Sequence, residues 1–258
     1  MLLEVKELHA GYDDKEIIHG ASFEIDHGEF VCIIGANGCG KTTMLKNILG
    51  LIKPMSGQVL ISGKDASAMN EREHAQYLAY IPQVHKPPFP FRAADVVIMG
   101  RTPYLNELSR ISPKDRRIAY DAIEQLGITH LADKSYTQLS GGQQQLVLIA
   151  RALAQQTDLL IMDEPTASLD FGNQHLVLSR MRSLTDRGQS VLMVTHDPNH
   201  AFFVADRVIV VRDGLIVQNG SPREVITTEC LHEIYDADVS IIEAKDKNGE
   251  PRYVCVPL

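Results

Sequence analysis

The pattern of apolar and polar residues predicts strands near both ends of the chain and helices between them. Residues 2–12 and 19–25 alternate apolar with polar side chains, as half-buried strands do. Residues 30–34, 159–162 and 191–194 are short continuous apolar runs, which are typical of strands covered on both faces. The sequence therefore predicts some strands that are buried on one face and others that are buried on both faces.

The helical pattern falls mainly in the middle of the chain. Helical spacing is present at residues 41–52, 93–100 and 113–128, and in the segment after Ser140. A short buried strand, "LAYIPQ", is ended by Pro82, and the prolines in residues 84–92 predict a linker.

The remaining segments read as strands and hairpins. Residues 57–65 predict a strand between turns, and residues 206–221 predict a hairpin with Asp213-Gly214 at its turn. A second, smaller hairpin is expected around residues 247–250.

Buried strands that alternate with helices predict an α/β fold with a largely parallel sheet. We expect one domain over residues 1–258. Its core and antiparallel strands should occupy residues 1–85 and 157–220, with a helical subdomain at 86–156 and a C-terminal extension at 221–258.

The composition argues against several classes of protein but does not indicate a particular reaction. The 258 residues are 44% hydrophobic and 22% charged, with a formal net charge of −8, so nothing in the balance favours nucleic acid or an anionic membrane surface. The four cysteines form no CxxC pair, which argues against a disulfide framework or a zinc site. We find no signal peptide and no apolar run near the roughly 20 residues needed to cross a bilayer.

The stretch "GANGCGKT" carries the clearest chemistry. It fits G-x-x-x-x-G-K-[ST] with Gly35, Gly40, Lys41 and Thr42, between a predicted strand and a predicted helix. Glycines let backbone N–H groups surround a phosphate, and the helix directs its positive dipole end at the same anion. Lys41 would bind the β- and γ-phosphates, and the Thr42 hydroxyl would ligate Mg²⁺. A chance glycine turn explains this context poorly.

Polar residues at the ends of other buried strands complete a nucleotide site. Asp163 would hold Mg²⁺, and Glu164 would polarise the water that attacks the γ-phosphate. We expect these two side chains to point apart along the strand pleat. Alone, two acids at a strand exit are commonplace; beside a phosphate loop the functional interpretation is stronger.

Three further residues are candidates by position. His196 ends an apolar strand and could hold the attacking water, although a lone His there is more often a surface residue. Gln83 ends another strand and could reach both Mg²⁺ and the helical segment. Tyr12 could stack on an adenine ring, on the weaker basis of a single aromatic.

A second glycine turn, "LSGGQQQ", opens a predicted helix. Ser140 can cap that helix, but an ordinary cap does not explain Gly141 and Gly142, each of which costs helix stability. If this turn also binds phosphate, it could close over the same nucleotide or reach the nucleotide of another subunit. A head-to-tail pair with two-fold symmetry would contain two such composite sites.

These motifs in this order resemble the nucleotide-binding subunit of an ATP-binding cassette (ABC) transporter. The resemblance runs from about residue 2 to residue 220 and implies a P-loop, RecA-like α/β core with an antiparallel β subdomain and a helical subdomain. It implies ATP and Mg²⁺, with Thr42, Gln83 and Asp163 around the metal. It makes Glu164, Gln83 and His196 the catalytic group, and Asp170 a residue of the dimer interface.

The resemblance also assigns the nucleotide contacts. Cys39 stands where the family commonly has Ser. The expected nucleotide-binding residues are Tyr12, Gly35, Asn37, Gly38, Cys39, Gly40, Lys41, Thr42, Thr43, Ser140, Gly141, Gly142, Gln143 and Asp170.

Two stretches narrow the type of transporter. "VHKPPFPFRAADVVIMGRTPYL" and "LDFGNQ" resemble the importers of iron-siderophore complexes, haem and vitamin B12, with molybdate importers close by. The resemblance implies a second copy of this chain, two integral-membrane permease subunits and, indirectly, a substrate-binding protein, with no nucleic acid. It places the chain peripherally on the cytoplasmic face of the inner membrane.

Other classes stay open from the sequence. Soluble ABC-type ATPases act in DNA repair, translation and iron–sulfur assembly, but the first group usually has a long coiled-coil insertion and the second has tandem cassettes. This chain has one cassette and a short insertion. An exporter ATPase is the third alternative.

Overall fold

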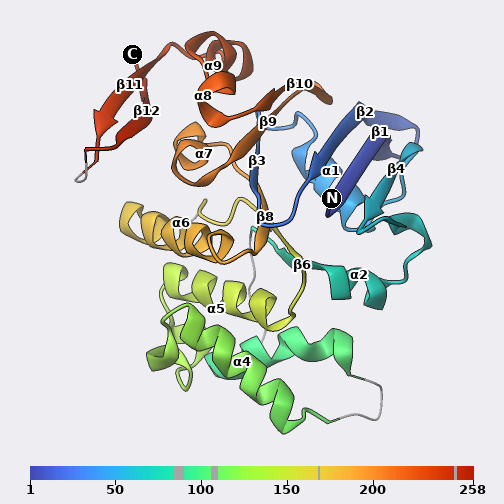
Figure 1. Ribbon diagram of the computed structural model, residues 1–258, viewed down its shortest axis with the longest axis vertical. Helices are drawn as coiled ribbons and strands as arrows, with labels where there is room; N and C mark the ends of the chain where they lie inside the picture. Colours follow the sequence, from blue (N-terminus) through green and yellow to red (C-terminus); the bar gives the residue numbers. More distant parts are fainter. Residues whose placement is uncertain (84–89, 106–109, 168, 247–248) are drawn as a thin grey trace. The chain divides into compact units, whose positions relative to one another are not determined.

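The computed structural model describes residues 1–83, 90–105, 110–167, 169–246 and 249–258, which fold as two compact units (Figure 1). The first unit is Met1–Ala68 with Thr185–Leu258, and the second is Met69–Leu184. The predicted linker falls largely on residues 84–89, which lie outside the described residues, as do residues 247–248 of the predicted second hairpin.

The first unit contains an antiparallel sheet in the order β2-β1-β4-β5. The alternating burial of its strands explains their alternating sequence, because one face is covered and the other is exposed. The strands are β1 (Leu3–Tyr12), β2 (Lys15–Ile25), β4 (Ser56–Ile61) and β5 (Lys64–Asp65), followed by the short 3₁₀ turn η1 (Ala66–Ala68).

The same unit contains a second group of strands in the order β10-β9-β3-β8, in which β3 pairs in parallel with both β8 and β9. The strands β3 and β8 are buried along their whole length, as their continuous apolar runs predict. The bounds are β3 (Phe30–Ile34), β8 (Ser190–Val194), β9 (Arg207–Arg212) and β10 (Leu215–Gly220).

The predicted hairpin between β9 and β10 is confirmed. The two strands pair antiparallel, and Asp213 and Gly214 at their turn have positive φ angles of 48° and 78°. The C-terminal hairpin is also confirmed, with β11 (Val239–Lys245) pairing antiparallel with β12 (Pro251–Pro257).

The described residues of the first unit contain four α-helices. The predicted helix 41–52 is shorter than expected, because α1 ends at Ile48 and Gly50 follows with φ 69°. The sequence did not predict the other three, of which α8 has only 4 residues. The four are α1 (Lys41–Ile48), α7 (Pro198–Val204), α8 (Pro222–Val225) and α9 (Thr228–Tyr235).

The second unit contains the parallel pair of β6 (Leu78–Ile81) and β7 (Leu159–Asp163), together with most of the helices. The predicted helices 93–100, 113–128 and the one after Ser140 are present, the first continuing as a 3₁₀ helix. They are α2 (Glu71–Tyr77), α3 (Ala93–Ile98), η2 (Met99–Tyr104), α4 (Pro113–Gln125), η3 (Thr129–Leu131), η4 (Tyr136–Gln138), α5 (Gly141–Ala154) and α6 (Phe171–Thr185), whose last residue falls in the first unit.

Contacts of η2 join it to α4 and α5 in this unit. The buried Arg101 guanidinium pairs with Asp115 of α4 at 3.1 Å and donates to the Ala154 carbonyl at the end of α5. Gly100 lies against the Arg151 backbone so closely that a Cβ atom would not fit. In the part of the chain that the structure describes, no helix is both long and apolar enough to cross a bilayer.

Candidate functional site

The predicted phosphate loop joins β3 to α1 in the first unit. Gly35 follows the strand directly, and a Cβ atom there would collide with the Val211 carbonyl and the Cys39 sulfur. Gly40 precedes the helix with φ 108°, and a Cβ would press into Ile18. Close packing against the backbone therefore requires glycine at position 35, and the left-handed conformation favours glycine at position 40.

The start of α1 presents backbone N–H groups rather than a side-chain cap. Gly40 is the N-cap and makes no capping hydrogen bond. Asn37 and Gly38 at the tip of the loop are exposed, as is Thr42 on the first turn, whereas Thr43 is buried. An exposed loop in front of an uncapped helix start is the arrangement that accepts an anion.

The ammonium group of Lys41 spans the loop. The side chain is only 5% exposed, and Nζ donates to the carbonyls of Gly35 at 2.7 Å and Ala36 at 2.8 Å. Beside it, Cys39 is buried, and this burial raises the pKa of the thiol although the Lys41 charge opposes the shift. The thiol therefore stays protonated and is a poor nucleophile.

Tyr12, the predicted adenine contact, lies against α1. Its ring is 38% exposed, and Lys46 donates from Nζ to its hydroxyl at 3.2 Å. The Lys46 Nζ atom also lies 5.3 Å from the ring centroid. Burial acts to raise the pKa of Tyr12, but hydrogen bonds from Lys46 and Thr43 outweigh it and the pKa is lowered. No pattern in the sequence indicates Lys46 as a partner of this ring.

His196 belongs to the same unit as the loop. It follows β8, whose Val194 is the Cα partner of Ile33 in β3, so the two carboxyl strand ends meet at one edge of the sheet. His196 is exposed and lies between Thr195, which is buried, and Asp197, which is half-buried. The structure thus places Tyr12, the phosphate loop and His196 in one unit.

The second unit contains Gln83, Asp163 and Glu164. Gln83 donates from Nε2 to Oε2 of Glu164 at 2.9 Å, so the ends of β6 and β7 are joined by their side chains. Asp163 is buried at the end of β7. Burial raises the pKa of Tyr80, and the negative charge of Asp163 raises it further. The carboxylate therefore lies near the Tyr80 hydroxyl.

The relation between the two acids differs from the expectation in one respect. The strand ends at Asp163, and Glu164 has φ 46°, a left-handed conformation that is uncommon outside glycine. Strand alternation therefore does not determine the direction of the Glu164 side chain. That direction is determined by the left-handed backbone conformation and by the hydrogen bond from Gln83.

The second glycine turn opens α5 with a capping box. The Ser140 side chain accepts from the Gln143 N–H at 3.4 Å, and the Gln143 side chain accepts from the Ser140 N–H at 3.2 Å. A Cβ atom on Gly142 would collide with the Asn173 side chain of α6, whereas one on Gly141 would approach, among the described residues, Leu169 at 3.3 Å. Packing therefore accounts for Gly142 and leaves Gly141 without a comparable structural reason.

Asp170 precedes α6 in this unit. Its Oδ1 accepts from the Asn173 N–H at 2.9 Å and its Oδ2 from the Asn173 side-chain amide at 2.8 Å. Within the chain Asp170 thus caps a helix. Asn173 joins this cap to Gly142, a connection that the sequence did not reveal.

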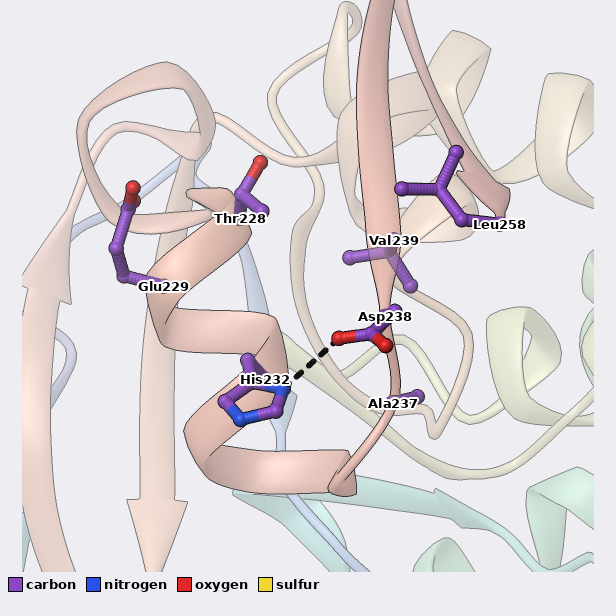
Figure 2. Close-up of a pocket in the computed structure, with 7 residues that line it drawn as sticks. All are labelled: Thr228, Glu229, His232, Ala237, Asp238, Val239 and Leu258. Atoms are coloured by element: carbon purple, nitrogen blue, oxygen red, sulfur yellow. Dashed lines mark ion pairs between the residues drawn. The ribbon is translucent and has the colours of Figure 1, made fainter.

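A pocket in the C-terminal extension is distinct from these residues (Figure 2). It contains an ion pair between Nδ1 of His232 and Oδ1 of Asp238 at 3.5 Å. The other residues that line it are Thr228, Glu229, Ala237, Val239 and Leu258. None of the predicted site residues lines this pocket.

One residue of the extension does approach the phosphate loop. Tyr235, the last residue of α9, is half-buried; burial of its hydroxyl raises the pKa of that group, and a hydrogen bond with the Gly35 backbone opposes the shift. The segment that contains Tyr235 showed no functional pattern, so sequence reasoning missed this contact.

Comparisons with known proteins agree on a family. The family model described as ABC transporter matches residues 18–167. An uncharacterized ABC transporter ATP-binding protein of Haemophilus influenzae is 42% identical over 235 residues, which cover 91% of this chain and 89% of that protein. The iron(3+)-hydroxamate import ATP-binding protein FhuC of Bacillus subtilis is 35% identical, covering 93% of this chain and 90% of FhuC.

A solved structure gives the same result for the fold. The structure, described as an inward-facing conformation of a metal-chelate type ABC transporter, aligns with a TM-score of 0.88 at 30% sequence identity. The alignment covers 100% of this chain and 97% of that one. The expected P-loop α/β fold is confirmed.

Proposed function

The chain belongs to the ABC transporter family as an ATP-hydrolysing subunit, and on that premise we propose that it powers a binding-protein-dependent importer of a metal chelate. The Gln83–Glu164 hydrogen bond at 2.9 Å is the observation that supports the hydrolytic part most directly. A carboxylate that a neighbouring amide orients is suited to act as a general base toward water.

In this proposal, residues of the first unit bind ATP. Backbone N–H groups of the phosphate loop and the start of α1 surround the phosphates, and Lys41 adds a positive charge. The Tyr12 ring, held by Lys46, offers an aromatic face to the adenine. Asn37, Gly38, Cys39 and Thr43 contribute through the backbone and the first helical turn.

Hydrolysis needs one proton acceptor and a held water. Glu164 accepts the proton as the water oxygen attacks the γ-phosphorus, and the bond to the β–γ bridging oxygen breaks. His196 orients the γ-phosphate and the water. Gln83 orients the Glu164 carboxylate through its amide N–H.

Each of the three residues assigned to Mg²⁺ offers an oxygen donor of the kind that this ion prefers. That ion prefers oxygen ligands and keeps part of its water shell. The Thr42 hydroxyl is exposed, the Asp163 carboxylate ends β7, and the Gln83 amide has an oxygen acceptor besides the N–H that binds Glu164. When bound, the ion supplies positive charge to the phosphate oxygens.

A second copy of the chain completes the site in this proposal. Packing accounts for Gly142 and the capping box for Ser140 and Gln143, which leaves Gly141 without a comparable structural reason among the described residues. In a head-to-tail dimer, the turn Ser140–Gly141–Gly142–Gln143 of one chain would close on the γ-phosphate held by the other, with Asp170 at the interface.

The proposed cargo is inferred from the relatives of this chain and not from the geometry of the site. An iron-siderophore complex is the first candidate, with haem, vitamin B12 and molybdate as alternatives. Two integral-membrane permease subunits and a substrate-binding protein would be the partners, with the chain on the cytoplasmic face of the membrane. We retain the proposed division into a core, a helical subdomain at 86–156 and an extension at 221–258.

Reconstitution tests this proposal. The chain, its candidate permease and its binding protein are placed in vesicles, and uptake of labelled ferric hydroxamate, haem, vitamin B12 and molybdate is followed with and without ATP. We expect ATP-dependent uptake of one metal chelate, which Lys41→Ala abolishes by weakening nucleotide binding. Hydrolysis without uptake, or ATP-driven efflux, would contradict an importer and favour a soluble ATPase or an exporter.

A further inference from the structure

The segment around His196 is held by backbone and side-chain hydrogen bonds on both sides. The N–H of Thr195 donates to the Ile33 carbonyl in β3 at 3.1 Å, and its hydroxyl accepts from the N–H of Asp197 at 3.1 Å. Nδ1 of His200 lies 3.2 Å from the same hydroxyl. The backbone on both sides of His196 is therefore fixed.

Asp197 extends this fixation into α7. Its carboxylate accepts from the Asn199 N–H at 2.8 Å and so caps the helix. Its other oxygen lies 3.4 Å from Nε2 of His200. The position of His196 thus depends on the position of α7.

The helix α7 is in turn fixed to the C-terminal hairpin by Asn199. Its Oδ1 accepts from the Cys255 N–H at 2.7 Å, and its Nδ2 donates to the Cys255 carbonyl at 3.3 Å. One side chain thus pairs with both backbone groups of a residue 56 positions away. Cys255 is the buried residue of β12, at 8% exposure.

A second contact supports the same docking. The rings of Phe202 in α7 and Tyr253 in β12 have centroids 5.9 Å apart, and the Arg223 guanidinium lies 4.4 Å from the Tyr253 centroid. Burial raises the pKa of the Cys255 thiol to about 11, and the Asp197 charge adds to the shift. The sulfur and the cap of α7 are therefore close.

We propose that Asn199 is a positioning residue for hydrolysis, which uses the C-terminal hairpin as a fixed support for α7 and thereby holds His196 in place. The inference rests on the proposed role of His196 at the γ-phosphate. The C-terminal extension would thereby contribute to hydrolysis, although it contains none of the predicted site residues.

The experiment compares full-length variants by steady-state ATP hydrolysis and nucleotide binding. Asn199→Ala removes both bonds to Cys255, and Asn199→Asp keeps the acceptor but loses the donor. Arg252→Ala is the matched control in the same hairpin, because Arg252 contacts Asp246 at 3.3 Å and not α7. We expect Asn199→Ala to lower kcat about tenfold while KM for ATP changes less than about twofold.

The readout specific to positioning is a double-mutant cycle with His196→Ala. If Asn199 acts through His196, adding Asn199→Ala to His196→Ala lowers kcat no further. An unchanged kcat in Asn199→Ala, or an equal fall in both backgrounds, overturns the proposal. So does a fall in the Asn199 variants that matches only a loss of folded protein, measured by thermal unfolding.

The cycle also separates this inference from the function it rests on. If His196→Ala hydrolyses ATP at the wild-type rate, the assigned role of His196 is wrong. If His196→Ala is impaired but Asn199→Ala is not, only the role of Asn199 is wrong.

Discussion

The amide of Gln83 and the carboxylate of Glu164 are joined by a hydrogen bond of 2.9 Å between Nε2 and Oε2. The two residues are 81 positions apart, and each follows a strand of the parallel pair β6–β7. Glu164 at the same time has a left-handed backbone, with φ 46°. Such a conformation is retained only where the surroundings enforce it, and it often marks a functional residue.

Glu164→Gln should abolish turnover and preserve ATP binding. The amide has nearly the shape of the carboxylate but cannot accept the proton, so kcat should fall about 10²- to 10⁴-fold. Single-turnover hydrolysis and equilibrium binding of ATP measure the two effects separately, and the variant should accumulate as an ATP-bound dimer. Hydrolysis near the wild-type rate would exclude Glu164 as the base.

Gln83→Glu tests the contact itself, with Gln83→Ala as the control. Both variants lose the amide N–H, but only Gln83→Glu places a second negative charge next to Glu164. A like charge raises the pKa of a carboxyl group, so the acidic limb of the pH–rate profile should move to higher pH in Gln83→Glu alone. Identical acidic limbs in the two variants would show that these groups are apart during turnover.

The two glycines of the second turn should respond differently to alanine. In Gly142→Ala the new methyl group meets Asn173, and we expect a loss of about 1–3 kcal/mol in the free energy of unfolding. In Gly141→Ala the new methyl group meets, among the described residues, the Leu169 side chain at 3.3 Å, and alanine is favoured over glycine in a helix by about 1 kcal/mol.

Urea unfolding of both variants checks this difference. Gly141→Ala should be at least as stable as the wild type, so any fall in its ATPase rate would reflect phosphate binding rather than folding. Equal destabilisation of the two variants would contradict the packing account.

The burial of His200 predicts a loss of stability in acid. Burial lowers its pKa, Asp197 opposes the shift and His196 adds to it. The unfolded chain therefore takes up the proton first, at a pKa of about 6.5, and stability falls as the pH drops from there toward the lower native pKa.

The slope should be at most about 1.4 kcal/mol per pH unit for this one group. Urea midpoints at pH 7.5 and 5.5 should differ more in the wild type than in His200→Gln, which cannot take up a proton. The same difference in both proteins would mean that His200 is not the group responsible.

The local features of this chain could be predicted from its sequence. The run Phe30–Ile34, the glycine loop and the helix after Lys41 are consecutive, so one motif specifies a strand, a loop and a helix together. Ser140 was likewise predicted as a cap, and the capping box confirms it.

Contacts between distant segments could not be predicted in this way. Asn199 and Cys255 are paired by a side chain and a backbone, which leaves no periodic pattern in either segment. The helix α6 was not predicted, and the reason for Gly142 became visible only when α6 brought Asn173 against α5. The left-handed turn at Glu164 is set by tertiary context, which strand periodicity does not report.

The central claim is that one working site is built from two chains, and complementation between two inactive variants tests it most directly. Lys41→Ala disables the phosphate loop. Gly141→Asp places a negative charge at the start of α5, which favours the helix but repels a γ-phosphate. Each variant alone should be inactive.

When the two variants are mixed in equal amounts, half of the dimers should be mixed, and each of these has one site with an intact loop and an intact turn. The account predicts recovery to about a quarter of the wild-type ATPase rate per chain if the two sites act independently. A mixture no more active than its two components would contradict a site shared between chains.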